Sequence, residues 1–286
     1  MPSSLVVASM PDGPVTQTQL IDDLMTLGMR PASVVMVHAR VSAIGWVVGG
    51  SETIIRSLLD VLGPDGTLMA FAGWEDNPFH LAEWPSSWRA AYETGTPPFD
   101  PVISEAKHAH GRLPERIRTW PGARRSADPE ANVVAIGGQA TWITAAHPAD
   151  APWGEHSPLA RLVEANGQVL MLGAPLDTIT LLHHAEAIAA TPHKRLVTYH
   201  MPVRGHDGTI YWRTTTTIDT ARGAFDYARV VGRDEDAFAV IGHAALAVGI
   251  GTHGRVGQAV TYLFPARALI AFAVHWMEKY FAQDGG

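Results

Sequence analysis

Two residues that together can move a proton, His183 and Glu186, stand three positions apart in the segment Leu182-His183-His184-Ala185-Glu186. In a helix this spacing places both side chains on the same face. A carboxylate that bonds one imidazole nitrogen fixes the tautomer of the ring and leaves the other nitrogen free to accept a proton, as a general base must. The same spacing also occurs in ordinary surface pairs, so the motif alone indicates either a proton-accepting site or a surface contact.

The elements that position this pair can be predicted from short apolar runs. Each run has the length of a buried strand, and the segments between the runs have helical periodicity. The runs are Val34–Val37, Leu68–Phe71, Val133–Ile136 and Val169–Leu172, and the helical segments are Ser51–Leu62, the mixed stretch Glu105–Arg118, and Thr180–Ala190. This alternation predicts an α/β fold with a mainly parallel central sheet flanked by helices.

Glycines and side chains that can bind or react with a ligand follow the apolar runs. In open α/β sheets ligands bind at the carboxyl ends of the strands. We therefore expect one edge of the sheet to gather an imidazole, an indole, carboxylates and glycines. The segments concerned are His38-Ala39-Arg40, Gly73-Trp74-Glu75-Asp76, Gly137-Gly138 and Gly173-Ala174-Pro175.

The second half of the chain has a different pattern. Turn residues at 205–208 separate two extended segments and predict a β-hairpin. A helix, a strand and a closing helix are expected after it. The segments are Leu196–Val203 and Thr209–Ile218 for the hairpin, then Asp234–Val248, Val256–Phe264 and Pro265–Phe281. We expect a tail over residues 1–14 and a single domain over residues 15–286, because no linker or repeat divides the chain.

Composition narrows the function classes. The 286 residues include 28 acidic and 21 basic side chains, for a formal charge of -7, and no cysteine. This balance argues against nucleic-acid binding and suits a cationic ligand. Disulfides and thiolate metal sites are excluded. No signal peptide or apolar run of membrane-spanning length is present, so we expect a cytoplasmic protein without a membrane partner.

Several familiar motifs are missing or stand in the wrong context. The chain has no Gly-x-Ser-x-Gly elbow, no Walker phosphate loop and no His-Glu-x-x-His zinc helix. The glycines of segment 249–254 match a dinucleotide fingerprint, but they follow a predicted helix, so we interpret them as a helix-ending loop. His108 and His110 are either a metal-binding pair or solvated side chains.

Ordered sequence blocks across nearly the whole chain resemble the aminoglycoside 3-N-acetyltransferase family. The blocks are Val37-His38-Ala39, Ala43-Ile44-Gly45 with Gly49-Gly50, Gly63-Pro64-Asp65-Gly66-Thr67, Pro97-Pro98-Phe99-Asp100-Pro101, Pro121-Gly122-Ala123-Arg124-Arg125-Ser126, His156-Ser157-Pro158, Leu172-Gly173-Ala174-Pro175, Leu182-His183 with Ala185-Glu186, and Lys194-Arg195. The resemblance implies a fold distinct from the common acetyltransferases, whose pyrophosphate-loop signature is absent.

The resemblance also implies a reaction and its catalytic pair. Acetyl-coenzyme A is the expected co-substrate, with no metal, and a polycationic aminoglycoside is the expected acceptor. His183 is expected to take a proton from the 3-amine while that amine attacks the thioester directly, and Glu186 is expected to orient the ring.

Family blocks further imply a coenzyme side and an acceptor side. On the coenzyme side we expect His38, Ala39, Arg40, Val41, Ser42, Arg125, Ser126 and Ser157. Alternatively, Arg124-Arg125 is a surface pair and Ser157 caps a helix that begins at Pro158. On the acceptor side we expect Trp74, Glu75, Asp76, Asp100, Asp219 and Asp226, and Trp74 either stacks on a sugar ring or packs in the core.

Departures from the family pattern and rival functions stay open at this point. Many relatives have His or Asn where this chain has Asp128, and small hydroxyl residues where it has Arg40 and Val41. The rivals are a metal-dependent amide hydrolase, a non-catalytic binding module for coenzyme A or cationic sugars, and the same chemistry on a non-antibiotic amine. A monomer or a homodimer is expected.

Overall fold

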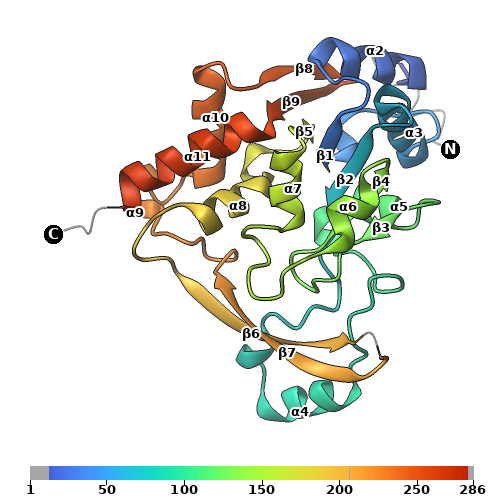
Figure 1. Ribbon diagram of the computed structural model, residues 1–286. Helices are drawn as coiled ribbons and strands as arrows, with labels where there is room; N and C mark the ends of the chain where they lie inside the picture. The colour runs from blue at the N-terminus through green and yellow to red at the C-terminus, as the bar shows by residue number, and fades with distance from the viewer. Residues whose placement is uncertain (1–12, 206, 283–286) are drawn as a thin grey trace.

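The main sheet has seven strands in the order β3-β4-β2-β1-β5-β9-β8, and β6 and β7 form a separate two-stranded sheet (Figure 1). The computed structural model describes residues 13–205 and 207–282. The strands are β1 (Val34–Ala39), β2 (Thr67–Phe71), β3 (Arg124–Arg125), β4 (Val133–Gly137), β5 (Gln168–Leu172), β6 (Leu196–Arg204), β7 (Ile210–Ile218), β8 (Thr252–Val256) and β9 (Ala259–Pro265).

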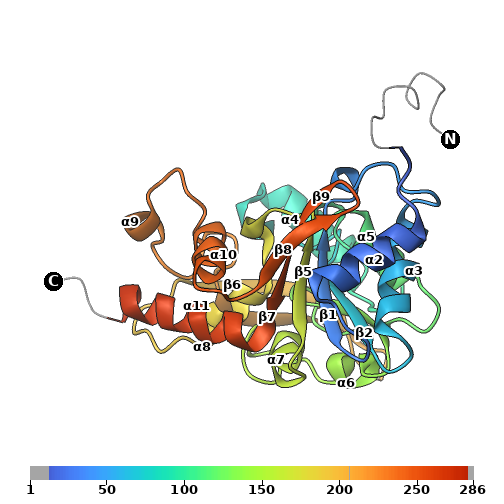
Figure 2. The same cartoon turned by 90° about the horizontal axis from the view of Figure 1, so that it is seen from above.

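Helices cover both faces of this sheet (Figure 2). They are α2 (Gln17–Leu27), α3 (Ser51–Leu62), α4 (Ser86–Gly95), α5 (Arg112–Arg118), α6 (Ala140–Ala145), α7 (Pro158–Glu164), α8 (Leu181–Ile188), α9 (Ala228–Val231), α10 (Ala237–Ala247) and α11 (Ala266–Phe281). Among the described helices, none combines the length and the apolar character needed to cross a bilayer.

Alternate residues of the central strands pack into two separate hydrophobic cores on opposite faces of the sheet. Val34 and Met36 of β1 pack with the apolar faces of α7, α8, α10 and α11. Val35 and Val37, which point the opposite way, pack with α2, α3 and α5. A strand with both faces buried needs apolar residues at every position, which is why these strands are continuous apolar runs in the sequence.

The predicted α/β class, the helix-flanked central sheet and the separate hairpin are confirmed. Parallel pairing is found at the centre of the sheet, where β1 lies between β2 and β5. The outer pairings, β2 with β4, β4 with β3, β5 with β9 and β9 with β8, are antiparallel.

The direction of β4 corrects one prediction about the edge of the sheet. Gly137 pairs with Thr67, the first residue of β2, so Gly137-Gly138 lies at the opposite edge from His38. A side chain at Gly137 would approach the carbonyl oxygen of Gly66 to 2.1 Å, so this glycine allows close backbone contact. The short hairpin from β3 into β4 reverses the chain, and the length of an apolar run carries no information on strand direction.

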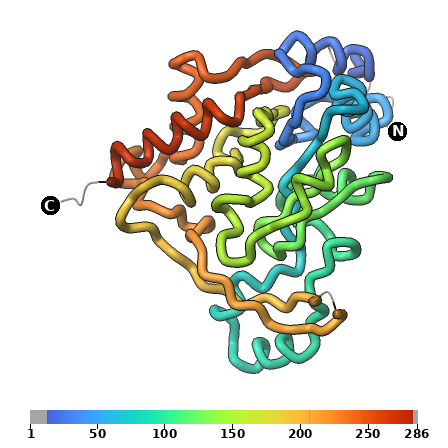
Figure 3. Tube along the Cα trace, viewed as in Figure 1, coloured from blue at the N-terminus to red at the C-terminus, as the bar shows by residue number. Residues whose placement is uncertain are grey.

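The long connection from β2 to β3 lies beside the β6–β7 hairpin (Figure 3). Phe99 of this connection pairs with Val203, and its N–H donates to the carbonyl of Pro202 at 2.8 Å. The ring of Phe79 lies 5.4 Å from that of Tyr199 on β6. The β2–β3 connection and the β6–β7 hairpin therefore pack against each other.

Most of the other predicted elements are confirmed within a few residues, with two corrections. Residues 252–256 form β8 and pair with β9, so the region predicted as a loop and one strand is a hairpin. In the stretch Glu105–Arg118 only α5 is an α-helix, because Gly111 adopts a φ of 85° immediately before it. The division into a tail and one domain stays a prediction, and residues 1–12 of that tail lie outside the described residues.

Candidate active site

Helix α8 holds His183 and Glu186 in direct contact. The Nδ1 atom of His183 lies 2.6 Å from Oε2 of Glu186. The glutamate side chain is fully buried, whereas the histidine side chain is 19% exposed. The spacing in the sequence thus predicted the correct contact, and the burial of Glu186 distinguishes it from an exposed surface pair.

Glu186 is fixed by two further hydrogen bonds. Its Oε1 atom accepts from the backbone N–H of Ala224 at 3.0 Å and from the hydroxyl of Tyr227 at 2.8 Å. The neighbouring carboxylate and burial both raise the pKa of Tyr227, with burial the larger cause, so the phenol keeps the proton that it donates. Because both carboxylate oxygens are held, Glu186 can orient the imidazole without moving.

The ring of His183 is held between aromatic side chains. Its centroid lies 5.1 Å from the ring of Trp153 and 4.9 Å from that of Phe238. Among the described residues, no hydrogen-bond partner contacts Nε2 of His183. With Nδ1 bonded to Glu186, the Nε2 atom is available to take a proton from a bound molecule.

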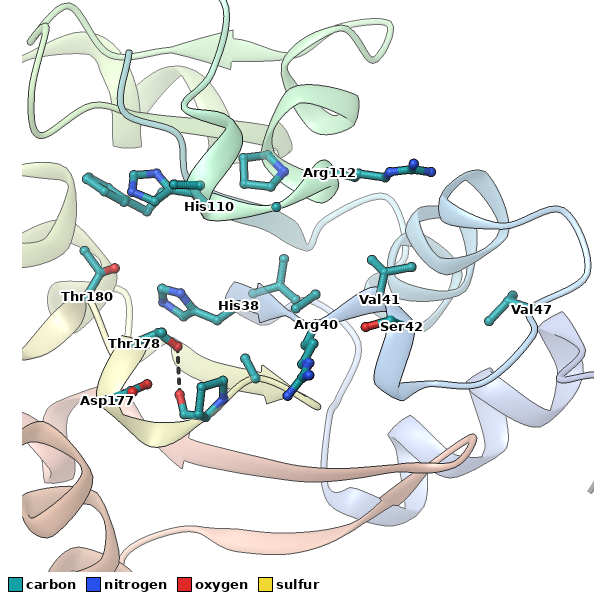
Figure 4. Close-up of a pocket in the computed structure, with 18 of the residues that line it drawn as sticks. His38, Arg40, Val41, Ser42, Val47, His110, Arg112, Asp177, Thr178 and Thr180 are labelled. Atoms are coloured by element: carbon teal, nitrogen blue, oxygen red, sulfur yellow. Dashed lines mark hydrogen bonds between the residues drawn. The ribbon is translucent and has the colours of Figure 1, made fainter. Parts of the chain in front are cut away.

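A cavity of about 1150 Å³, part of whose lining is drawn in Figure 4, has His183 among its lining residues. The end of β1 and the loop after it line part of this cavity with His38, Ala39, Arg40, Val41 and Ser42. This volume exceeds the roughly 300–1,000 Å³ typical of small-molecule sites, so it suits a long ligand. The expected coenzyme residues of this loop therefore share a cavity with His183.

His38 lies near Thr178 and Thr180 in the lining of this cavity (Figure 4). Burial, and to a lesser extent the neighbouring His110, lowers the pKa of His38 to about 3. Its Nε2 atom is buried without a hydrogen-bond partner among the described residues. His38 is thus a neutral imidazole at physiological pH and a poor proton acceptor.

Two arginines line the cavity from opposite walls, Arg40 and Arg112 (Figure 4). Both are exposed, and neither guanidinium has an ion-pair or hydrogen-bond partner among the described residues. Arg112 was missed by sequence reasoning, because a single arginine at the start of a helix is indistinguishable from a solvated one. The only available signal was the preceding Gly111, which begins α5 beside the cavity.

The other three expected coenzyme residues have structural contacts away from this cavity. Arg125 is half-buried over the ring of Phe99, and its guanidinium donates to Asn132 and to the carbonyls of Ser104 and Gly73. Ser126 accepts from the N–H of Val133 and bonds His147. Ser157 caps α7, as the alternative interpretation held, by accepting from Ala160 N–H at 3.2 Å.

The expected acceptor residues are scattered around the edge of the sheet. Trp74 is buried against Phe99, which is the packing alternative. Glu75 contacts His108, and Asp76 and Asp226 are exposed. Asp100 accepts from the N–H of Val102 and so shapes its own loop. Asp219 is buried and accepts from the N–H groups of Ala221 and Arg222.

A second cavity, of about 220 Å³, also has His183 among its lining residues. Phe71, His110 and His183 line both cavities, so the two meet at the candidate base. None of the six expected acceptor side chains lines the smaller cavity, but Thr220 and Ala221, in the turn held by Asp219, do. The smaller cavity also contains Glu130, which sequence reasoning did not select.

The two histidines considered as a metal pair have separate partners. His108 contacts Glu75 and Glu105, whereas Nδ1 of His110 lies 3.1 Å from the carbonyl oxygen of Ala72. Within residues 13–205 and 207–282, no group of three His, Asp or Glu side chains is arranged to hold a metal ion.

Comparison with known proteins gives one consistent result. The family model for aminoglycoside 3-N-acetyltransferases matches residues 36–278. Aminoglycoside N(3)-acetyltransferase VII of Streptomyces paromomycinus is 49% identical over 276 residues, which cover 96% of each chain. The crystal structure of aminoglycoside acetyltransferase AAC(3)-Xa superposes with a TM-score of 0.93 at 50% identity, covering 96% of both chains. AAC-IIIb, solved with CoASH, gives a TM-score of 0.86 at 44% identity and covers 96% of this chain and 100% of that one.

Proposed function

This chain belongs to the aminoglycoside 3-N-acetyltransferase family, and we propose that it acetylates the 3-amino group of the 2-deoxystreptamine ring of aminoglycosides from acetyl-coenzyme A. The observation that carries the proposal is the position of His183. The Nδ1 atom of His183 contacts the buried carboxylate of Glu186, and the imidazole ring lines both cavities. Two cavities that share a base suit two substrates that react with each other.

The larger cavity is assigned to acetyl-coenzyme A. It is long enough for an extended ligand, and Arg40 and Arg112 can pair with phosphate groups. Gly49 and Gly50, directly before α3, also line it, so the first N–H groups of that helix face the same space. Neutral His38 lines the same cavity as His183, so we assign the reactive end of the ligand to this part of it.

The chemical step follows from this arrangement. The 3-amine attacks the thioester carbonyl, so that a carbon–nitrogen bond forms and the carbon–sulfur bond breaks. The amine proton passes to Nε2 of His183, and the imidazolium then returns it to the departing thiolate. No acyl-enzyme is required, because donor and acceptor meet at the same base. Glu186 keeps Nδ1 protonated and stabilises the imidazolium that forms.

Arg112→Gln tests the assignment of the larger cavity. We expect the KM for acetyl-coenzyme A to rise by about tenfold, because one charge-assisted phosphate contact is lost. The KM for the aminoglycoside and the melting temperature are expected to stay unchanged, because Arg112 is exposed and has no hydrogen-bond or ion-pair partner among the described residues. Arg116→Gln is the matched control, since this arginine of α5 does not line the cavity. Equal KM values for acetyl-coenzyme A in Arg112→Gln and Arg116→Gln would contradict the assignment of the larger cavity.

Thiol release from acetyl-coenzyme A tests the reaction itself. The panel contains gentamicin, tobramycin, kanamycin, apramycin and a drug without a 3-amine. Release with the 3-amino drugs alone is the expected result, and mass and NMR analysis of the product should place one acetyl group on the 3-nitrogen. Binding without thiol release across the panel and across simple amines would favour a non-catalytic binding module. Activity lost to a chelator and restored by zinc would favour the amide hydrolase.

A further inference from the structure

The smaller cavity holds one carboxylate, that of Glu130, among its lining residues. Its volume of about 220 Å³ is below the range typical of a whole drug-sized ligand, so it accommodates only the part of an acceptor nearest to His183. Glu130 lies in the loop before β4, two residues after Asp128, whose Oδ1 accepts from the Glu130 N–H at 2.9 Å. That bond holds the backbone, and the side-chain amide of Asn77 holds the carboxylate itself.

Among the described residues, the Glu130 carboxylate forms no ion pair. Its Oε2 atom accepts a hydrogen bond from the side-chain amide of Asn77. Across the described ranges, Oε1 accepts no hydrogen bond, and no Lys, Arg or His forms an ion pair with either oxygen. A partly buried carboxylate with a single amide partner is poorly compensated, and a cation placed in the cavity would complete the site.

The electrostatic surroundings agree with this geometry. Burial raises the pKa of Glu130 to about 7, and Asp128 adds to the rise. Lys107, the Asn77 amide and His183 act in the opposite direction without cancelling it. Three further titratable side chains line the cavity besides Glu130 and His183: His80, Lys107 and His110. Because Lys107 repels a cation, it competes with any ammonium group that enters.

We propose that Glu130 binds a second ammonium group of the acceptor and thereby selects substrates whose reactive ring carries two amines. This inference rests on the proposed function, because it places the first amine at Nε2 of His183. The reasons are that both residues line one small cavity, that Glu130 is its only carboxylate among the described residues, and that one of its oxygens is unbonded. An ammonium group supplies both the charge and the hydrogen bonds that this oxygen lacks.

The test combines a change in the enzyme with a change in the ligand. The acceptors are tobramycin and its analogue with a hydroxyl in place of the 1-amine, the second amine of the deoxystreptamine ring. For the Glu130→Gln variant we expect the KM for tobramycin to rise about 10- to 100-fold, with the KM for acetyl-coenzyme A unchanged. For the wild-type enzyme, the KM for the analogue should exceed the KM for tobramycin by a similar factor. In the Glu130→Gln variant, the KM values for the two acceptors should differ by less than about threefold, because the carboxylate that binds the 1-amine is already absent.

Two control variants separate binding from a structural role. Lys107→Gln should lower the KM for tobramycin, because it removes the competing charge from the same cavity. If Glu130 served only to balance Lys107, then both variants would raise the KM, which would overturn the proposal. Glu164→Gln changes an exposed carboxylate away from the cavity and should leave every constant unchanged. The proposal would also be overturned if Glu130→Gln left the KM for tobramycin unchanged, or if this variant raised the KM values for tobramycin and for its analogue by the same factor.

Folding does not limit this test. Because the folded protein raises the pKa of Glu130 above its ordinary 4.5, the group favours the folded state at low pH, and this contribution is lost as the pH rises through about 7. Glu130→Gln should therefore melt no lower than the wild type at pH 8. If the wild type transfers no acetyl group at all, then the proposed function fails. Calorimetric titration of tobramycin into both proteins would still test Glu130 as an ammonium-binding residue.

Discussion

His183→Ala is expected to reduce kcat by about 10²–10⁴-fold, the contribution typical of a positioned general base. The side chain makes one hydrogen bond, to Glu186, and faces two cavities, so its removal takes away the proton acceptor while the coenzyme walls remain. The affinity for coenzyme A, measured by calorimetry, should change by less than about threefold.

A matched histidine controls for nonspecific effects of this change. His243→Ala removes an exposed imidazole on α10 and should leave kcat unaltered. Near-normal turnover by His183→Ala would refute its role as the base. A parallel loss of kcat and of coenzyme affinity would instead assign His183 to substrate binding.

Glu186→Gln is expected to reduce kcat by about 10²–10⁴-fold for a different reason. The amide nitrogen of a glutamine can face Nδ1 of His183, and that nitrogen would then accept a hydrogen bond and leave the proton on Nε2. A ring with Nε2 protonated cannot take a proton from the amine. The remaining amide oxygen can still accept from Ala224 and Tyr227, so the local fold is retained.

The tautomer of His183 provides a readout that a purely structural role would not change. In the wild type, ¹⁵N NMR of the labelled ring should show the proton of the neutral imidazole on Nδ1, and in Glu186→Gln on Nε2. Full activity with the tautomer reversed would show that Glu186 does not act through the ring. An unfolded variant would be recognised by its loss of coenzyme binding.

The sequence predicted those parts of the molecule that depend on local spacing. The three-residue separation of His183 and Glu186 placed them on one helical face, and the apolar run before His38 placed that residue at a strand end. Strand direction at β4 depends on a two-residue pairing at β3, which has no apolar pattern of its own. Gly137 was therefore assigned to the wrong edge.

Single charged residues were the hardest to interpret. Arg125 belongs to a basic doublet that suggests phosphate binding, but its guanidinium is used to hold carbonyl groups of the β2–β3 connection. Glu130 follows Asp128 and Pro129, as a solvated turn residue would, and only the fold shows that it lines a cavity. Burial of one side chain depends on distant segments, and the sequence near that residue does not encode them.

Asp128 joins the Glu130 loop to the β6–β7 hairpin. Its carboxylate is fully buried, accepts from the N–H groups of Glu130 and Ala131, and bonds the guanidinium of Arg213 on β7. A neutral side chain at this position would leave that arginine without its partner. The sequence near Asp128 does not reveal this partner, because Arg213 lies 85 residues further along the chain.

The antiparallel direction of β4 has a consequence for how such an enzyme can diversify. Because β2 ends and β4 begins at the same edge of the sheet, the whole intervening segment, residues 72–132, leaves and returns at that edge. Its first part, residues 73–107, lines the smaller cavity, whereas residues 109–114 line the larger one. Insertions and substitutions within residues 73–107 can therefore reshape the proposed acceptor cavity while Arg112, the β1 loop and the His183 helix stay unchanged. Natural selection by a new antibiotic can thus act on one contiguous stretch of the gene, with the proposed acetyl-donor side inherited intact.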